Sequence, residues 1–256
     1  MSSLNIYATK LDCGIAAGKM GAGKIRAAIA EKGSANIIIA TGASQFDMLQ
    51  TLVKEEGIDW SKVTMFHLDE YVGLPESHPA SFRKYIKERF LANLPSPIGA
   101  AYFVEGDAPD IQKMCDELGE TLKKHPIDVA FIGIGENGHI AFNDPPADFD
   151  TEEPYIVVDL DEVCRKQQLG EGWFPTFDDV PKQAVSMAVR QIMKSKTIIN
   201  TVPDGRKAYA VRITFQGELS NMHPASVVRL HSDCHTFCDA DSAAELPEIA
   251  KVFCTR

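Results

Sequence analysis

Short runs of apolar, largely β-branched residues alternate along this chain with longer segments whose apolar residues recur at helical spacing. The runs ANIIIAT (35–41) and IDVAFIGIG (127–135) are almost free of polar residues. Such runs are typical of strands that are buried on both faces of a sheet. Strands that alternate with helices indicate a mostly parallel sheet. The chain is therefore expected to adopt a Rossmann-like α/β fold, with helices on both faces of that sheet.

The helical segments are identified by the spacing of their apolar residues. Phe46, Leu49 and Val53 follow the helical period, and the segment 15–33 ends at Gly33, a residue type that commonly terminates helices. We expect helices over residues 15–33, 44–57, 81–94, 110–125, 182–195 and 204–217, and strands over residues 4–9, 35–41, 62–71, 127–135 and 196–202.

No low-complexity linker divides the chain, which predicts one domain over residues 1–256. The regular alternation breaks down around residues 145–180, where an acidic stretch precedes the sequence CRKQQLGEGWF. A long irregular segment inside a compact domain is often functional, so we expect a lid or an insertion there.

The charge balance and the length of the apolar runs exclude several classes of protein. The chain has 26 Lys and Arg against 36 Asp and Glu, a net charge of −10 without any basic run, which argues against a nucleic-acid partner. No apolar run is long enough to span a bilayer, and residues 1–12 do not resemble a signal peptide. Six cysteines, including Cys254, lack CxxC spacing, as expected of reduced thiols. We expect a cytoplasmic protein without a membrane partner.

One cluster of potential metal ligands occurs in the segment HSDCHTFC (231–238). If this segment is a strand, its side chains alternate between two faces. Cys234 and Cys238 then lie on the face opposite to His235, whereas the ligands of a structural zinc ion must converge on one point. We therefore expect no metal ion at this segment.

Polar residues directly follow three of the expected strands, at the carboxyl ends where ligands bind in open α/β sheets. The first group is Thr41, Gly42, Ala43 and Ser44, which stand between a buried strand and a helix. Backbone N–H groups and hydroxyls in such a turn suit a bound anion. A hydroxyl at this place also suits a helix N-cap, so the sequence leaves both interpretations open.

Lys207 is a second candidate for an anion site. It is expected in the first turn of a helix, where the helix dipole disfavours a cation. A bound anion would offset this cost. The alternative is a lysine that is solvated at the surface.

The second group is Asp69 and Glu70, which follow the apolar run VTMF. Adjacent residues on a strand point to opposite faces, so only one of these carboxylates can enter a cleft on one side of the sheet. A carboxylate at this place can act as a general base whose pKa is tuned by burial. It can equally cap a helix or be solvated.

The third group is found in GIGENGHIAFNDPP (133–146), where His139 and Asp144 follow a Gly-rich turn at a strand end. An imidazole titrates near neutral pH and a carboxylate can orient it, so the pair suits proton transfer. The alternative is a core histidine that is hydrogen-bonded to the backbone, but such a residue would not need the glycines or Asp144.

The ordered set of motifs resembles the glucosamine-6-phosphate deaminase/isomerase family, which is related to the 6-phosphogluconolactonases. The resemblance runs along nearly the whole chain, and its second and third motifs are the most specific. The motifs are ATGAS (40–44), LDEYVGLPESHPASF (68–82), GIGENGHIAFNDP (133–145), VPKQAVSMAV (180–189), GRKA (205–208) and HPASVVRLH (223–231).

The resemblance implies an enzyme that converts glucosamine 6-phosphate to fructose 6-phosphate and ammonia in amino-sugar catabolism, without a metal or another cofactor. It implies that Asp69 is the base that moves a proton between C2 and C1. His139 and Asp144, with Asn137 beside them, would open the sugar ring. The turn 41–44 and Lys207 would bind the phosphate, and Glu70 and Gly138 would complete the substrate site.

Three residues depart from the family pattern as the resemblance presents it. Asp144 stands where many members have Glu, and Asn137 replaces an aspartate that some members have. Gly172 stands where the family usually has a phosphate-binding arginine, and we expect Arg165 to be its substitute. A shift of about 1 Å in a catalytic group can cost roughly 10²-fold in rate, so these positions bear on specificity.

The departures leave three alternative functions open. The enzyme could act on galactosamine 6-phosphate, or it could hydrolyse a lactone as the 6-phosphogluconolactonases do. The chain could also be a non-catalytic module that senses a sugar phosphate, although it has neither a helix-turn-helix segment nor a basic face. The resemblance leaves the oligomeric state open, because family members range from monomers to hexamers, and a homo-oligomer is among the states it allows.

Overall fold

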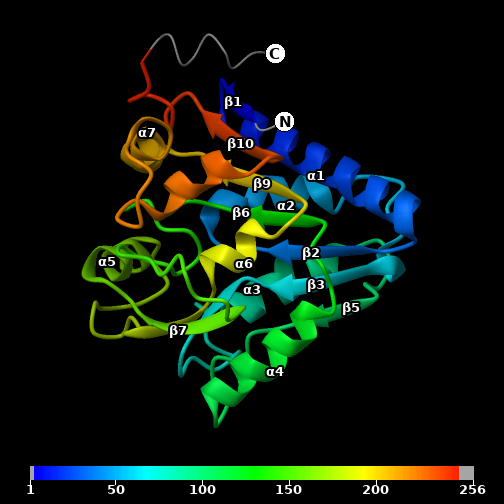
Figure 1. Cartoon of the computed structure of the whole chain (residues 1–256), viewed down its shortest axis with the longest axis horizontal. Coiled ribbons are helices and arrows are strands. Elements are labelled where there is room, and N and C mark those ends of the chain that lie inside the picture. The colour runs from blue at the N-terminus through cyan, green and yellow to red at the C-terminus, as the bar shows by residue number, and fades with distance from the viewer. Residues whose placement is uncertain (1–2, 248–256) are drawn as a thin grey trace.

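Seven parallel strands form the central sheet of the computed structural model, which describes residues 3–247 (Figure 1). They lie in the order β1, β10, β9, β6, β2, β3 and β5, which confirms the expected mostly parallel α/β sheet. Cys254 lies outside the described residues. In chain order the strands are β1 Ser3–Tyr7, β2 Ala35–Ile39, β3 Val63–His67, β5 Ala100–Tyr102, β6 Val129–Ile132, β9 Thr197–Val202 and β10 Cys234–Asp239.

Helices cover both faces of this sheet, as the sequence predicts. In Figure 1, α6 lies in front of the sheet and α2 lies behind it. The α-helices are α1 Lys10–Lys32, α2 Phe46–Leu52, α3 Phe82–Arg89, α4 Ile111–Lys123, α5 Glu162–Gly170, α6 Val189–Met193 and α7 Ala208–Gln216. Short 3₁₀ segments are η1 Ala43–Gln45, η2 Trp60–Lys62, η3 Leu91–Asn93, η4 Gly205–Lys207 and η5 Pro224–Leu230.

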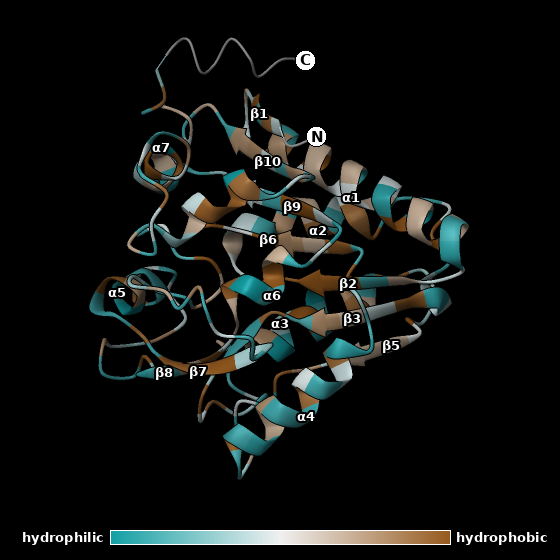
Figure 2. Cartoon of the chain, in the orientation of Figure 1, coloured by the Kyte–Doolittle hydropathy of each residue, from teal (hydrophilic) through white to brown (hydrophobic). Residues whose placement is uncertain are grey.

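The inner strands β2, β6 and β9 of the central sheet are buried on both faces, and the sheet divides the interior into two hydrophobic clusters. Ile37 and Ile39 of β2 pack with α1, α2 and α3, whereas Ile38 packs in the cluster that includes α4, α6 and α7. In Figure 2, β2 is brown and the outer surface of α4 is largely teal, as expected of a buried strand and a surface helix. The continuous apolar run in the sequence therefore reflects burial from both sides.

The expected alternation in residues 234–238 is confirmed. The segment is part of β10, with Cys234 and Cys238 in one hydrophobic cluster and Phe237 in the other. The ring of His235 contacts Ser3 Oγ at 2.8 Å. The imidazole and the two thiols therefore lie on opposite faces of the sheet.

A second, smaller sheet begins where β3 ends. Its antiparallel strands are arranged in the order β4, β8 and β7, with bounds β4 Asp69–Tyr71, β8 Gln183–Met187 and β7 Tyr155–Asp159. The sequence predicted one strand over 62–71, but the chain interrupts it at Leu68 and moves from one sheet into the other. The Leu68 carbonyl accepts a hydrogen bond from the Met187 N–H at 2.9 Å, which joins the two sheets.

Two helix predictions are corrected by the structure. Residues 182–195 were expected to form one helix, but strand β8 occupies their first part because β4 and β7 pair with it on either side. Only Val189–Met193 is helical. Helix α3 stops at Arg89 rather than near residue 94, and a 3₁₀ turn follows it. Tertiary pairing overrides the local helical spacing in β8.

The segment expected to be irregular contains regular structure. Strand β7 and helix α5 lie within residues 145–180, and α5 begins at Asp161, whose Oδ1 accepts a hydrogen bond from the Cys164 N–H at 2.6 Å. No helix in the described part of the chain combines the length and the apolar character needed to cross a membrane.

Helix α1 packs closely against α2 because the face of α1 that contacts α2 carries glycines. It begins at Thr9, whose hydroxyl accepts from the Asp12 N–H, and ends at Gly33, which adopts a left-handed conformation with φ of 81°. A Cβ on Gly18 would lie 2.7 Å from the Met48 carbonyl oxygen of α2. On Gly23 of the same helix, a Cβ would meet only the Arg26 guanidinium, at 4.0 Å.

We predict that Gly18→Ala lowers the free energy of unfolding by about 1–3 kcal/mol, because the added methyl group overpacks the contact between α1 and α2. The matched change Gly23→Ala has room and gains helix propensity, so it should raise the free energy of unfolding by up to about 1 kcal/mol. Urea unfolding followed by circular dichroism measures both. Equal effects of the two changes would contradict the close packing of α1 on α2.

Candidate active site

The candidate site lies at the switch point of the central sheet. From β2 the chain proceeds to β3 and β5, and then crosses to β6 on the other side of β2. The connections that follow β2 and β6 therefore diverge and leave a crevice at their carboxyl ends, the place where ligands bind in open α/β sheets. A pocket is present there, and it also receives residues from the ends of β3 and β9.

Residues from the three sequence motifs and from α5 line this pocket. They are Ala40, Thr41, Gly42, Ala43, Ser44, Gln45, Leu68, Asp69, Phe82, Gly133, Ile134, Gly135, His139, Ala141, Phe142, Gln167, Gln168, Glu171 and Lys207. The structure thus brings together the predicted turn 41–44, Asp69, His139 and Lys207. It places Asp144, Asn137, Glu70, Gly138 and Arg165 outside this lining.

The turn 41–44 is held by two contacts that bridge separate elements. Gly42 has φ of 96°, a conformation that glycine adopts without strain, and its carbonyl accepts a hydrogen bond from the Tyr85 hydroxyl at 3.0 Å. The Gln45 side chain donates to the Thr201 carbonyl at the end of β9. The turn is therefore fixed by α3 and by the central sheet.

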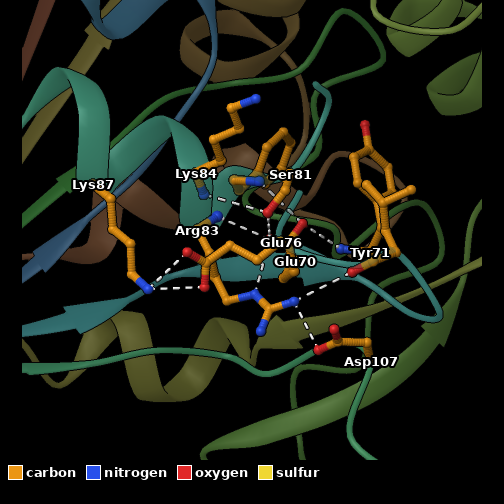
Figure 3. A network of polar contacts seen from close by, with 10 residues as sticks. Glu70, Tyr71, Glu76, Ser81, Arg83, Lys84, Lys87 and Asp107 are labelled. Carbon is orange, nitrogen blue, oxygen red and sulfur yellow. Dashed lines mark hydrogen bonds and ion pairs between the residues drawn. The ribbon is translucent and has the colours of Figure 1, made fainter. Parts of the chain in front are cut away.

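Asp69 and Glu70 point in opposite directions, as expected of neighbours on a strand. Asp69 faces the pocket, whereas Glu70 is fully buried at the start of α3. Its carboxylate accepts hydrogen bonds from the Ser81 hydroxyl and from the backbone N–H groups of Tyr71, Phe82 and Arg83 (Figure 3). Glu70 is therefore not placed as a substrate ligand, because its oxygens are occupied by α3 and its own strand.

The two carboxyl groups have different electrostatic surroundings. Burial, and secondarily the charge of Glu70, raise the pKa of Asp69 to about 8. The Asp69 carboxylate accepts no hydrogen bond from any described residue. Burial also raises the pKa of Glu70, but its hydrogen bonds with Arg83, Phe82, Ser81 and Tyr71 oppose that effect. Asp69 is thus a carboxyl group that is left available to the pocket.

His139 and Asp144 form the predicted pair. Nδ1 of His139 lies 3.0 Å from Oδ1 of Asp144, and both side chains are buried. The contact does not have the geometry of a well-directed hydrogen bond. Burial alone would raise the pKa of Asp144, but His139, an Asn137 hydrogen bond and the Asp161 N–H together lower it. His139 lines the pocket and Asp144 lies behind it.

Asn137 positions this pair without lining the pocket. Its Nδ2 donates to Asp144 Oδ1 at 3.0 Å and to Asp161 Oδ2 at 3.1 Å, while its Oδ1 accepts from the His139 N–H at 3.0 Å. An aspartate at this position would have no hydrogens to donate to the two carboxylates. The neutral amide therefore fits the surroundings that the fold provides.

The glycines before His139 make room for the imidazole. A Cβ on Gly135 would lie 2.1 Å from Cε1 of His139, so any side chain at residue 135 would displace the ring. Gly138 has φ of 89° and reverses the backbone just before His139. Its own position is structural, because its carbonyl accepts from the Ala225 N–H at 2.8 Å and it does not line the pocket.

Lys207 reaches the pocket from the connection that follows β9. The residue is 5% exposed, and its ammonium group makes no hydrogen bond with any described residue. Burial lowers its pKa, while the nearby carboxylates of Glu136 and Glu171 oppose that effect. Lys207 is the one Lys or Arg among the described residues that line the pocket. Such a buried cation without a partner suits an anionic ligand.

Arg165 does not replace the arginine that is missing at Gly172. Its guanidinium donates to the carbonyls of Phe177 and Val180, each at 2.9 Å, and stacks on the Phe177 ring. It holds the segment that follows α5 instead of entering the pocket. Gly172 has φ of 83° and follows Glu171, which does line the pocket.

The sequence analysis missed several residues of the pocket. Gln167, Gln168 and Glu171 enter it from α5 and its end, and Phe82 and Phe142 contribute aromatic rings that stack on each other. The side-chain Oε1 of Gln167 accepts a hydrogen bond from the Glu136 N–H at 2.9 Å, which connects α5 to the turn after β6. Gln167, Gln168 and Glu171 carry no sequence signal for this, because they belong to the segment that looked irregular, whereas Phe82 and Phe142 lie within the second and third motifs.

The chain is similar in sequence to known enzymes. Residues 12–237 match the family model described as glucosamine-6-phosphate isomerases/6-phosphogluconolactonase. The glucosamine-6-phosphate deaminase of Streptococcus uberis is 36% identical over 84% of this chain and 88% of its own length. Glucosamine-6-phosphate deaminase 1 of Bacillus subtilis is 34% identical over 86% of this chain and 90% of its own length.

Similar structures have also been solved. A monomeric glucosamine-6-phosphate deaminase superimposes with a TM-score of 0.85 and 29% identity, covering 95% of this chain and 99% of its own. The 6-phosphogluconolactonase of Trypanosoma brucei superimposes with a TM-score of 0.75 and 16% identity, covering 96% and 99% of the two chains. The second likeness concerns the fold alone.

We predict that Glu70→Gln lowers the free energy of unfolding by about 1–3 kcal/mol, because the new amide cannot accept the hydrogen bonds at both oxygens and leaves a buried donor unpaired. The matched change Glu76→Gln breaks only the exposed pair with Lys87 and should cost less than about 1 kcal/mol. Denaturant unfolding at pH 7 measures both. Equal stability of the two variants would show that the Glu70 contacts contribute nothing.

Proposed function

The chain belongs to the family of glucosamine-6-phosphate isomerases and 6-phosphogluconolactonases, and we propose that it is a glucosamine-6-phosphate deaminase that uses Asp69 as its base. The reaction converts the amino sugar and water into fructose 6-phosphate and ammonia. The observation that supports this choice is the buried Asp69 carboxyl, which faces the pocket without a hydrogen-bonding partner among the described residues. Hydrolysis of a lactone gives such a carboxyl no evident role.

Ring opening is assigned to His139 together with Asp144. The pyranose ring must open before the proton at C2 becomes acidic, and opening moves a proton from the C1 hydroxyl to the ring oxygen. An imidazole that titrates near neutral pH suits this transfer. The contact of 3.0 Å between His139 Nδ1 and Asp144 Oδ1 orients the imidazole ring.

Isomerisation is assigned to Asp69. The ionised carboxylate removes the C2 proton of the open-chain aldehyde, and the electron pair forms a double bond between C1 and C2. The C1 oxygen takes up a proton that the substrate's ammonium group gives up, so that an enolamine forms. The same carboxyl group returns the proton to C1, which leaves an imine at C2. Water then adds to the imine carbon, and ammonia departs as the ketone forms. A single carboxyl group can serve both carbons because they are adjacent.

The phosphate is assigned to Lys207 and the turn 41–44. Lys207 supplies a buried positive charge, and Thr41 and Ser44 supply hydroxyls to the same pocket. The missing arginine at Gly172 leaves this subsite with less positive charge than the family pattern implies. We therefore keep galactosamine 6-phosphate among the substrates to be compared.

Helix α5 and the segment after it are proposed to act as a lid within a single domain. Gln167, Gln168 and Glu171 line the pocket from this side. A lid that closes over the sugar would exclude water until the imine has formed. We place the reaction in the cytoplasm, because a phosphorylated sugar is charged and does not cross a bilayer freely. The family resemblance places it in amino-sugar catabolism.

We predict that Asp69→Asn lowers kcat for ammonia release from glucosamine 6-phosphate by about 10²–10⁴-fold, because the amide cannot accept the C2 proton. The assay measures ammonia and fructose 6-phosphate, with galactosamine 6-phosphate and 6-phosphogluconolactone as parallel substrates. The matched change Asp159→Asn, at an exposed residue of the small sheet, should leave the rate unchanged.

Three outcomes would contradict the proposal. Turnover of glucosamine 6-phosphate at the wild-type rate in Asp69→Asn would exclude Asp69 as the base. Hydrolysis of 6-phosphogluconolactone without any ammonia release would show that the chain is a lactonase. Tight binding of the sugar phosphate without turnover of any of the three compounds would indicate a sensing module.

We predict that kcat/KM rises with pH, is half-maximal near pH 8 and levels off above it, because Asp69 must be ionised in the free enzyme and its pKa is raised to about 8. The profile of kcat should rise at lower pH, since the ammonium group of the bound substrate favours the ionised carboxylate. Initial rates between about pH 6 and pH 10, roughly two units either side of the expected pKa, measure both profiles.

A variant separates Asp69 from the titration of the substrate itself. The charge of Glu70 is the second cause of the raised pKa of Asp69, so Glu70→Gln should shift the rise of kcat/KM to lower pH. A rise that comes from the substrate would not move in this variant. A profile of kcat/KM that is flat from pH 6 to pH 9, roughly the span around the expected pKa, would contradict the assignment.

A further inference from the structure

Cys164 lies beside the pair of His139 and Asp144, although the sequence gives no hint of it. One side-chain ligand atom of each of the three residues lies within 4.8 Å of those of the other two. Cys164 is the least exposed of the three, at 0%, and His139 is 6% exposed. The proposed reaction uses His139 and Asp144 but assigns no role to this thiol.

We propose that His139, Asp144 and Cys164 form a binding site for a single Zn²⁺ ion, and that the bound ion inhibits the enzyme. Zn²⁺ prefers thiolate, imidazole and carboxylate ligands in a tetrahedral arrangement. Three protein ligands leave a fourth position for water or a substrate hydroxyl. Because His139 lines the pocket, an ion reaches this position from the pocket side.

The spacing of the ligand atoms is close to what the ion requires. Zinc–ligand bonds of about 2.0–2.3 Å in a tetrahedron place ligand atoms roughly 3.5 Å apart. Nδ1 of His139 and Oδ1 of Asp144 are 3.0 Å apart, and no pair in the cluster exceeds 4.8 Å. Side-chain movements of about 1 Å therefore suffice to close the site around an ion.

Nδ1 of His139 is available as a metal ligand. This nitrogen is buried and makes no well-directed hydrogen bond, so the lone pair of one tautomer can be given to a metal ion. The Asp144 carboxylate is already oriented by Asn137 Nδ2 and by the Asp161 N–H, at 3.0 and 3.1 Å. Outer contacts of this kind are what usually fix metal ligands in place.

Binding of the ion leaves the buried cluster electrically neutral. The thiol of Cys164 loses one proton to solvent, Asp144 is already a carboxylate, and a neutral His139 keeps its proton on Nε2. The two negative charges then balance the two positive charges of Zn²⁺, which avoids the cost of an unpaired buried charge. One proton is released for each ion bound to the form with neutral His139.

The consequence for the enzyme follows from the ligation of Nδ1. A metal-bound imidazole that no longer contacts Asp144 cannot take up and return a proton during ring opening. This inhibition rests on the proposed deaminase function, whereas the binding of Zn²⁺ does not. The pair that performs the first chemical step would therefore also be the site at which the metal stops it.

The test uses Zn²⁺ alone with the full chain, and the matched variants Cys164→Ser and Cys115→Ser. Cys115 is another buried thiol, on α4, and it does not line the pocket. Calorimetry in two buffers of different ionisation enthalpy measures the stoichiometry, the affinity and the number of protons released. Spectra with Co²⁺ in place of Zn²⁺ report a thiolate ligand directly, and ammonia release reports inhibition.

We expect one ion and one released proton per chain in the wild type and in Cys115→Ser, with a thiolate–Co²⁺ absorption band. Cys164→Ser should keep its metal-free activity, lose that band, and bind Zn²⁺ at least about 10-fold more weakly. Equal affinity in Cys164→Ser, or no stoichiometric binding in the wild type, would overturn the proposal. If no ammonia is released at all, the proposed function fails while calorimetry and spectra still decide the metal site.

Discussion

Two neighbouring carboxyl groups are buried where the chain passes from the central sheet into the small antiparallel sheet, and the site depends on how each is accommodated. Glu70 is enclosed by Ser81 and three backbone N–H groups, so its hydrogen bonds fix the start of α3 against β4. Asp69 receives no such contact from the described residues and faces the pocket. The cost of burying Asp69 alone is expressed as its raised pKa.

Glycines in the turns that border the pocket leave space that a side chain would fill. Gly135 is bare because the His139 ring occupies the place of its Cβ. Gly42 adopts a positive φ that opens the turn after β2. Both turns lie beside the switch point of the sheet, so the fold creates the crevice and the glycines keep it accessible.

The pair of His139 and Asp144 is proposed both to open the sugar ring and to bind a metal ion. Asn137 and Asp161 orient Asp144 toward His139, which suits proton transfer. A ring nitrogen of His139 also lies within 4.8 Å of the thiol of Cys164, a residue of α5. Helix α5 also supplies Gln167 to the pocket, so the proposed lid and the proposed metal site share one element.

The sequence by itself determined the parallel sheet, the opposite directions of Asp69 and Glu70, and the grouping of the turn 41–44, Asp69, His139 and Lys207 at the strand ends, because hydrophobic run length and strand alternation are local properties. The tertiary structure decided that residues 183–187 form a strand, that Arg165 faces away from the pocket, and that Cys164 reaches Asp144. These outcomes depend on partners that are distant along the chain, and no local pattern encodes which side chains such partners meet.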